Sequence, residues 1–328
     1  MDTHALTLEF FLGLHSDLLW NEAQTILRRA AASKSPYWRL PVVACEAVGG
    51  EPERAIPAVT AVACAQISIT LIDDLLDADP RGEQHRLGVP AVANLAAAFQ
   101  ATALEAVAHD VVACDPQIKL AALDNLNLTI KTVAFGQHLD AQNPTDEAAY
   151  WRVVQTKSAP FFGTALHIGA LLGGASFEVA KQFWRFGCLY GEMVQIHDDL
   201  NDSMATPANP DWTLGRSSLP ILFAQVVDHP DRERFLALRQ AIPDPEALAE
   251  AQSILIRCGA VSYGIHQLLC RYREGCEVLG AMPLPYRTGV EALLEEQVEP
   301  VRELFAATGI SQPNHLMRRD RWQGRNHS

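Results

Sequence analysis

Two short acidic clusters, each at the end of a long apolar stretch, constrain this chain more than any other feature. Residues 73–77 read D-D-L-L-D and residues 198–202 read D-D-L-N-D, 125 positions apart. On a helix, the first and last aspartates of each cluster share a face, where like charges repel by about a few tenths of a kcal/mol. Carboxylates near a helix C-terminus also oppose the macrodipole, by about 0.3–1 kcal/mol each. Because this unfavourable pattern occurs twice, it indicates that something positive offsets it.

Hard divalent cations are the obvious counter-charge for such clusters. Mg²⁺ prefers oxygen ligands and commonly keeps water and substrate phosphates among them. Two facing clusters would hold several Mg²⁺ ions around a diphosphate and neutralise the charge that develops when the C–O bond breaks. An allylic group that leaves as a carbocation also needs an apolar pocket that excludes water. A solvated helix end would account for one cluster, but it accounts poorly for two.

The composition predicts that the clusters belong to an all-α protein. Hydrophobic residues make up 48% of the 328 positions, and strand-forming residues dominate no long stretch. Pro and Gly divide the chain into helical segments. We expect helices near residues 4–31, 37–48, 54–77, 89–109, 116–142, 146–157, 160–173, 176–203, 217–227, 231–240, 245–279 and 287–308. Short linkers favour a single helical domain over residues 1–310, built around a central apolar cavity, with a polar basic tail over residues 311–328.

The net charge and the cysteines limit which partners and which cellular compartment the sequence allows. A net charge of −13 argues against nucleic-acid binding, which needs a basic surface. Seven cysteines without a C-x-x-C pair favour a reduced, cytoplasmic protein, and the N-terminus lacks the basic region of a signal peptide. Residues 55–72 carry no charge over nearly the length of a membrane span, but polar residues interrupt them and acids follow at once. We therefore expect a fully buried helix and not an integral membrane protein.

Further motifs, in a fixed order, connect the two clusters to a known family. Gln66 lies seven residues before the first cluster, and Gln195 lies three before the second. Between them are a G-Q-x-x-D pattern at residues 136–140 and a Lys-Ser pair at residues 157–158, and a D-x-x-x-G-R-S-S-L-P segment follows at residues 211–220. From about residue 36 to residue 225, and more loosely to the end, the chain resembles the trans-isoprenyl diphosphate synthases of the polyprenyl synthetase family. The resemblance implies the all-α isoprenoid synthase fold and a homodimer.

The resemblance also implies roles for individual residues. Asp73, Asp77 and Asp198 would be the direct ligands of Mg²⁺, three ions in all with the diphosphate, and together with Lys157 they would form the catalytic set. The supporting acidic residues would be Asp74, Asp199 and Asp202. The residues that would contact the substrates are Gln66, Phe135, Gln137, Ser158 and Gln195, with Arg86, Lys157 and Arg216 on the allylic diphosphate.

Pocket depth in the family depends on the residues four and five positions before the first cluster. Here these are Ile69 and Ser68, and Ala65, Cys64 and Ala61 follow further from the cluster. Mostly small side chains at these positions predict a deep pocket for a C15–C20 allylic chain. Close helix packing through small residues would leave the same pattern.

Departures from the family pattern concern the second substrate. The family carries G-G-K-R-x-R-P near its N-terminus, where Lys and Arg bind isopentenyl diphosphate, but residues 36–41 read P-Y-W-R-L-P. Tyr37 and Trp38 thus replace two cations, and Leu87 replaces the second Arg of an R-R-G-x-P motif. We therefore expect an enzyme that ionises an allylic prenyl diphosphate as a terpene synthase, or that prenylates another acceptor. Tyr37 and Trp38 would face that neutral acceptor or the carbocation.

Two alternatives remain open at this point. The chain could be an ordinary elongating synthase, of the geranylgeranyl or farnesyl type, whose cations come from other positions. Candidates are Arg39, Arg54, Arg81, His85 and the tail residues Arg318, Arg319, Arg321 and Arg325. It could also be a non-catalytic subunit of a hetero-oligomeric synthase, although two intact acidic clusters argue against that reading.

Overall fold

The fold is all-helical in the computed structural model, which describes residues 2–14, 20–109 and 115–307. No strand occurs in these ranges, so the predicted all-α class is confirmed. The first half contains α1 (Thr3–Gly13), α2 (Asn21–Ser33), η2 (Pro36–Arg39), α3 (Leu40–Ala47), η3 (Pro52–Ala55), α4 (Ile56–Leu76), α5 (Gln84–Leu87), α6 (Val89–Ala108) and α7 (Pro116–Asp140). The second half contains α8 (Glu147–Val153), η4 (Val154–Ser158), α9 (Ala159–Gly173), α10 (Phe177–Met204), α11 (Pro210–Thr213), α12 (Leu219–Val226), α13 (Arg232–Ala241), α14 (Pro245–Arg257), α15 (Ala260–Ala281) and α16 (Thr288–Ala307).

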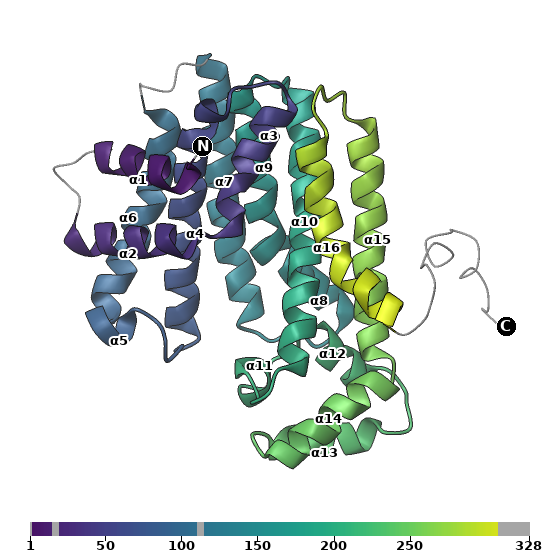
Figure 1. Cartoon of the computed structure of the whole chain (residues 1–328). Coiled ribbons are helices and arrows are strands. Elements are labelled where there is room, and N and C mark those ends of the chain that lie inside the picture. The colour runs from purple at the N-terminus through teal and green to yellow at the C-terminus, as the bar shows by residue number, and fades with distance from the viewer. Residues whose placement is uncertain (1, 15–19, 110–114, 308–328) are drawn as a thin grey trace.

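The uncharged stretch of the sequence forms α4, which is buried almost all round. It packs against α6 and α9, and α1 lies across it (Figure 1). Small residues such as Ala58, Ala61 and Ala63 are fully buried and let the neighbouring helices approach closely. Two helical segments, residues 52–76 and α6, are long and apolar enough to cross a membrane. The first has 78% of its apolar window buried, as expected for the core helix of a globular protein, and α6 has 39%.

Helices α9 and α10 run side by side through the centre of the molecule (Figure 1). They touch backbone to backbone, because a Cβ atom on Gly187 would lie 2.7 Å from the Cα atom of Gly163. Since α9 also packs against α4, the helix that carries the first acidic cluster, this close contact connects α10 and the second cluster to α4 through α9. Gly163 and Gly187 therefore allow the close packing of the core and also help to position the second acidic cluster.

A second hydrophobic cluster lies at one end of the bundle, formed by α11 to α14 (Figure 1). Trp212 and Phe235 pack edge to face within it, and Trp212 Nε1 donates to the carbonyl of Ser203 at 3.1 Å. Gln252 on α14 donates to the carbonyl of Ala205 at 2.9 Å. These bonds fasten the segment after α10 against the end of that helix, beside the second acidic cluster.

Most predicted helices occur near their expected bounds, with three differences. The expected helix 245–279 is divided after Cys258, because Gly259 adopts φ +88° and ends α14. The expected helix 4–31 is represented by α1 and α2, with residues 15–19 outside the described ranges. The helix expected over 146–157 changes into a π-helical turn at Val154–Ser158. The predicted tail over residues 311–328 also lies outside the described residues.

Candidate active site

Both acidic clusters open into one cavity of about 310 Å³, here called the carboxylate cavity. It lies where the C-terminal ends of α4, α7 and α10 meet the π-helical turn and the segment after α11. Its charged lining residues are Asp73, Asp140, Asp198, Asp199, Asp202, Asp211, Lys157 and Arg216. Six carboxylates therefore face two cations in a confined space.

Lys157 reaches the first cluster from the π-helical turn. The turn lies against α7 so closely that a Cβ atom on Gly136 would be 2.3 Å from the backbone nitrogen of Lys157. From this position Lys157 Nζ lies 3.0 Å from Asp73 Oδ1 and 2.5 Å from Asp140 Oδ2. Burial lowers the pKa of Lys157, but Asp73 and Asp140 outweigh burial and raise the pKa above its ordinary value. The ammonium therefore stays charged.

Asp73 has a second partner, and Asp77 is held from another part of the chain. Gln137 Nε2 donates to Asp73 Oδ1 at 2.7 Å. Both terminal nitrogens of Arg216 bond to the Asp77 carboxylate, one of them at 2.8 Å to Oδ2. This bond pins the segment after α11 to the end of α4.

Asp199, predicted as a supporting metal ligand, is surrounded by donors from the protein. Its carboxylate is buried and accepts three hydrogen bonds, from Tyr150 Oη at 2.7 Å, the Leu219 amide at 2.7 Å and Gln195 Nε2 at 2.8 Å. Burial raises its pKa to about 6, and these three donors act in the opposite direction. Through these donors Asp199 connects α8, α10 and α12, and its support of a metal ion stays a prediction.

Two other carboxylates of the cavity, those of Asp198 and Asp211, also have raised pKa values. Burial and the nearby Asp202 raise the pKa of Asp198 to about 6. Burial also raises the pKa of Asp211 to about 6, with Asp199 and Asp202 adding to it. Crowded, partly desolvated carboxylates of this kind are the ligand set that Mg²⁺ prefers. Among the described residues, no three acidic, His or Cys side chains are grouped closely enough to hold a metal ion. Asp73 and Asp77 are instead paired with Lys157 and Arg216.

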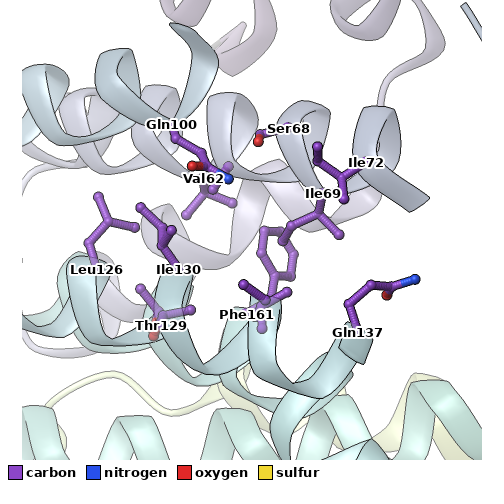
Figure 2. A pocket seen from close by; sticks show the side chains of 14 residues that line it. Val62, Ser68, Ile69, Ile72, Gln100, Leu126, Thr129, Ile130, Gln137 and Phe161 are labelled. Atoms are coloured by element: carbon purple, nitrogen blue, oxygen red, sulfur yellow. The ribbon is translucent and has the colours of Figure 1, made fainter. Parts of the chain in front are cut away.

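An apolar cavity lies between α4, α7 and α9, and Gln137, which lines it, donates a hydrogen bond to Asp73 of the carboxylate cavity. Figure 2 shows Gln137 and Ile72 at one end of it, Gln100 and Leu126 at the other, and the ring of Phe161 projecting between them. Ser68 and Ile69 both line it, as predicted, although the Ser68 hydroxyl donates to the carbonyl of Ala96 at 2.9 Å. Its volume is only about 60 Å³, the space of a few water molecules. The deep pocket predicted from small side chains is therefore not open in this conformation.

A third cavity, of about 360 Å³, lies between α2, η2 and the C-terminal half of α4, and is called the α2–α4 cavity here. Gln66 lines it, and its side-chain oxygen accepts hydrogen bonds from Trp38 Nε1 at 2.9 Å and Ser35 Oγ at 3.1 Å. Trp38 is almost fully buried. Tyr37 packs edge to face on Phe162 instead, and its pKa is raised by burial and by the nearby charge of Asp198. Trp38 thus lines the α2–α4 cavity, whereas Tyr37 lines none of the three cavities.

Several predicted residues lie elsewhere. Phe135 is 45% exposed, with the Arg152 guanidinium 5.6 Å from its ring centre, so it is not a lining residue. Arg86 pairs with Glu83 and lines none of the three cavities. Ser158 does line the carboxylate cavity and donates to Gln195 Oε1 at 2.6 Å.

Three further residues named in the sequence analysis lie away from the carboxylate cavity or are paired elsewhere. Asp74 lines the α2–α4 cavity, not the carboxylate cavity. Arg39, a candidate replacement cation, pairs with Glu296 on α16. Leu87 packs against the main hydrophobic core.

Three of the lining residues whose roles the sequence did not reveal show why. Asp211 was recognised only as part of a motif and not as a carboxylate of the cavity. Phe161 follows the Lys-Ser pair in an apolar run, which gives no signal for a cavity side chain. Arg29 lies on α2, outside every motif, and only the packing of that helix brings it to the α2–α4 cavity.

The sequence is similar to that of known prenyl diphosphate synthases. The sequence model of the family described as polyprenyl synthetase matches residues 37–255. A geranylgeranyl diphosphate synthase from Methanosarcina mazei is 32% identical over 186 residues, which cover 53% of this chain and only about half (55%) of that protein. A short chain isoprenyl diphosphate synthase from Methanothermobacter thermautotrophicus is 28% identical over 261 residues, covering 73% of this chain and 79% of that one.

Solved structures share the fold. A geranylgeranyl pyrophosphate synthetase from Pyrococcus horikoshii superposes with a TM-score of 0.77 at 23% identity, covering 90% of this chain and 95% of that one. A polyprenyl synthetase from Streptomyces coelicolor gives a TM-score of 0.74 at 20% identity, with the same coverage. The helical arrangement is thus the isoprenoid synthase fold, and the chain belongs to the polyprenyl synthetase family.

Proposed function

We propose that this protein is a Mg²⁺-dependent trans-prenyl diphosphate synthase of the geranylgeranyl type, which joins isopentenyl diphosphate to an allylic diphosphate. The observation that carries the proposal is that Asp73, the second acidic cluster, Lys157 and Arg216 line one cavity, and that Gln137 connects Asp73 to an apolar cavity. The names of the Methanosarcina and Methanothermobacter relatives support the same reaction. This was the alternative reading of the sequence, and the relatives favour it over a terpene synthase.

In this proposal the residues of the carboxylate cavity exchange partners when substrate binds. Bound Mg²⁺, three ions in all, would be held by Asp73, Asp77 and Asp198 and would neutralise the charge on the departing diphosphate. Lys157 and Arg216, released from their carboxylates, then donate to the diphosphate oxygens.

The apolar cavity supplies the other half of the chemistry. The double bond of isopentenyl diphosphate provides the electron pair for the new C–C bond, the diphosphate leaves with the C–O pair, and it then takes up the proton that the product cation loses. Ile69, Ile72 and Phe161 line the space for the allylic chain, proposed to be C15–C20, and exclude water from the cation.

A second candidate is favoured by one observation. Tyr37, Trp38 and Leu87 supply no cation where the family places three, and the negative charge of Asp198 helps to raise the pKa of Tyr37. An aromatic face beside the ionising carbon suits a carbocation or a neutral acceptor. This supports a terpene synthase, or a prenyltransferase with another acceptor.

A product assay separates these possibilities. The protein is incubated with Mg²⁺ and C10, C15 or C20 allylic diphosphate, each with and without isopentenyl diphosphate, and diphosphate release and extracted products are followed. We expect longer diphosphates only when isopentenyl diphosphate is present. Hydrocarbons or alcohols formed without isopentenyl diphosphate would instead establish a terpene synthase. If no substrate were turned over, the remaining interpretation would be a non-catalytic subunit of a hetero-oligomeric synthase.

We further infer a cytoplasmic homodimer, as the family resemblance implies. The outer side of α7 supports an interface, because Leu120 and Leu128 are exposed on it, two turns apart. Light scattering of the purified protein tests this state.

A further inference from the structure

The α2–α4 cavity holds two cations that the family motifs do not contain. Arg29 enters it from α2, and Arg81 enters it from the segment between α4 and α5. The cavity is also lined by Gln66 and Thr70, which lie four residues apart on α4. It has room for a small substrate, about 360 Å³.

We propose that Arg29 and Arg81 bind the diphosphate of the acceptor substrate, isopentenyl diphosphate, in the α2–α4 cavity. They replace the cations that are missing at Tyr37, Trp38 and Leu87. This inference rests on the proposed elongation reaction, but it names residues of its own and can fail independently.

The position of the cavity suits an acceptor. Seven residues turn an α-helix by nearly two full turns, so Gln66 lies almost directly in line with Asp73 on α4. Gln66 faces the α2–α4 cavity and Asp73 the carboxylate cavity, so the two cavities adjoin along one face of the helix. An acceptor held beside Gln66 would therefore sit next to the allylic diphosphate.

Both arginines are held by bonds that an anion can replace. Arg29 pairs with Glu83, and Arg81 pairs with Asp79 at 2.8 Å. The arginine side chains are 52% and 85% exposed, and ion pairs so open to water are weak. A diphosphate carries more charge than one carboxylate and offers each guanidinium a two-pronged partner. Both arginines can therefore exchange a carboxylate for phosphate oxygens.

The uncharged lining completes a site for a short diphosphate ester. The Gln66 oxygen is occupied by Trp38 and Ser35, which fixes the amide and leaves its nitrogen to donate. The buried ring of Trp38 and the side chains of Ile67 and Leu71 form an apolar wall for the five-carbon group.

Kinetics with each substrate varied in turn test the arginines. The variants are Arg29→Met, Arg81→Met and the double variant, with Arg28→Met as the matched control, because Arg28 is exposed on the same helix and lines no described cavity. We expect the KM for isopentenyl diphosphate to rise about tenfold in each single variant and about a hundredfold in the double variant. The KM for the allylic diphosphate and the melting temperature should change little.

A substitution with the opposite expected sign sharpens the test. Glu83→Gln removes the carboxylate that competes for Arg29, so the KM for isopentenyl diphosphate should fall. A merely structural role of the arginines would give no improvement in Glu83→Gln.

Calorimetric titration of isopentenyl diphosphate separates failure of the inference from failure of the proposed function. The titration uses protein holding Mg²⁺ and a non-reactive allylic thiolodiphosphate. If the wild type elongates but Arg29→Met and Arg81→Met behave like Arg28→Met, the arginine site is wrong and the synthase stands. If the wild type neither elongates nor binds isopentenyl diphosphate, both are wrong and the acceptor, if any, is uncharged.

Discussion

Two phenylalanines show how much a single side-chain direction matters at the residue scale. Phe161 projects into the apolar cavity, whereas Phe135 is exposed on α7 (Figure 2 for Phe161). Phe161→Leu should open the cavity and shift products to longer chains, because the ring fills the space between Ile69 and Leu126. Mass spectrometry of the products measures this shift. Phe135→Leu is the matched control, and a similar shift in both variants would contradict the assignment.

The same comparison shows where sequence reasoning stops at this scale. The motif placed Phe135 and Gln137 together, yet they are two residues apart on a helix and point in directions about 160° apart. Gln137 reaches Asp73, and Phe135 lies beneath Arg152. A motif gives residue types in order, but the phase of the helix decides which of them enter the site.

At the scale of elements, the contact between α7 and the π-helical turn positions Lys157. Gly136→Ala would place a Cβ atom 2.3 Å from the Lys157 backbone nitrogen, so the turn must shift. We expect about 1–3 kcal/mol lower unfolding free energy and a higher KM for the allylic diphosphate. Gly280→Ala on α15 is the control, because nothing lies within 4 Å of its Cβ position, and it should stabilise by about 0.5–1 kcal/mol. Denaturant unfolding and steady-state kinetics give both quantities, and equal effects in the two variants would contradict the prediction.

The sequence predicted some elements of the fold and not others. The apolar stretch before Asp73 predicted the buried helix α4, because an uncharged run of that length must be covered on all sides. The π-helical turn leaves no signature in residue types, since one extra residue in a turn is fixed by packing against Gly136. The approach of Arg29 likewise depends on how α2 packs against α4, which no local pattern encodes.

For the whole molecule, the crowding of acids makes metal-free stability depend on pH. Burial raises the folded-state pKa of Asp198, Asp199 and Asp211 to about 6, above the value of about 3.9 for an unfolded aspartate. A raised carboxyl pKa means that the folded state binds more protons, so these groups lower stability as pH rises from about 4 to about 6. Thermal unfolding should therefore show a larger stabilisation by Mg²⁺ at pH 7.5 than at pH 5.

An isosteric variant isolates one of these groups. Asp211→Asn removes a buried carboxylate without changing its size, so the melting temperature of the chelator-treated protein should rise at pH 7.5 and hardly change at pH 4. The pH dependence would then be flatter than in the wild type. A variant that follows the wild-type curve at every pH would show that Asp211 does not contribute.

The pairing of Lys157 and Arg216 with Asp73 and Asp77 has a thermodynamic consequence for the order of events. A metal that arrives alone must displace a cation that then has no partner, and a diphosphate that arrives alone leaves two carboxylates uncompensated. When both arrive, the two sets of charges exchange partners and none is left over. We therefore expect metal and substrate to be positively linked: each would raise the affinity for the other by the same factor, so the empty site would hold both weakly and the filled site would hold both tightly.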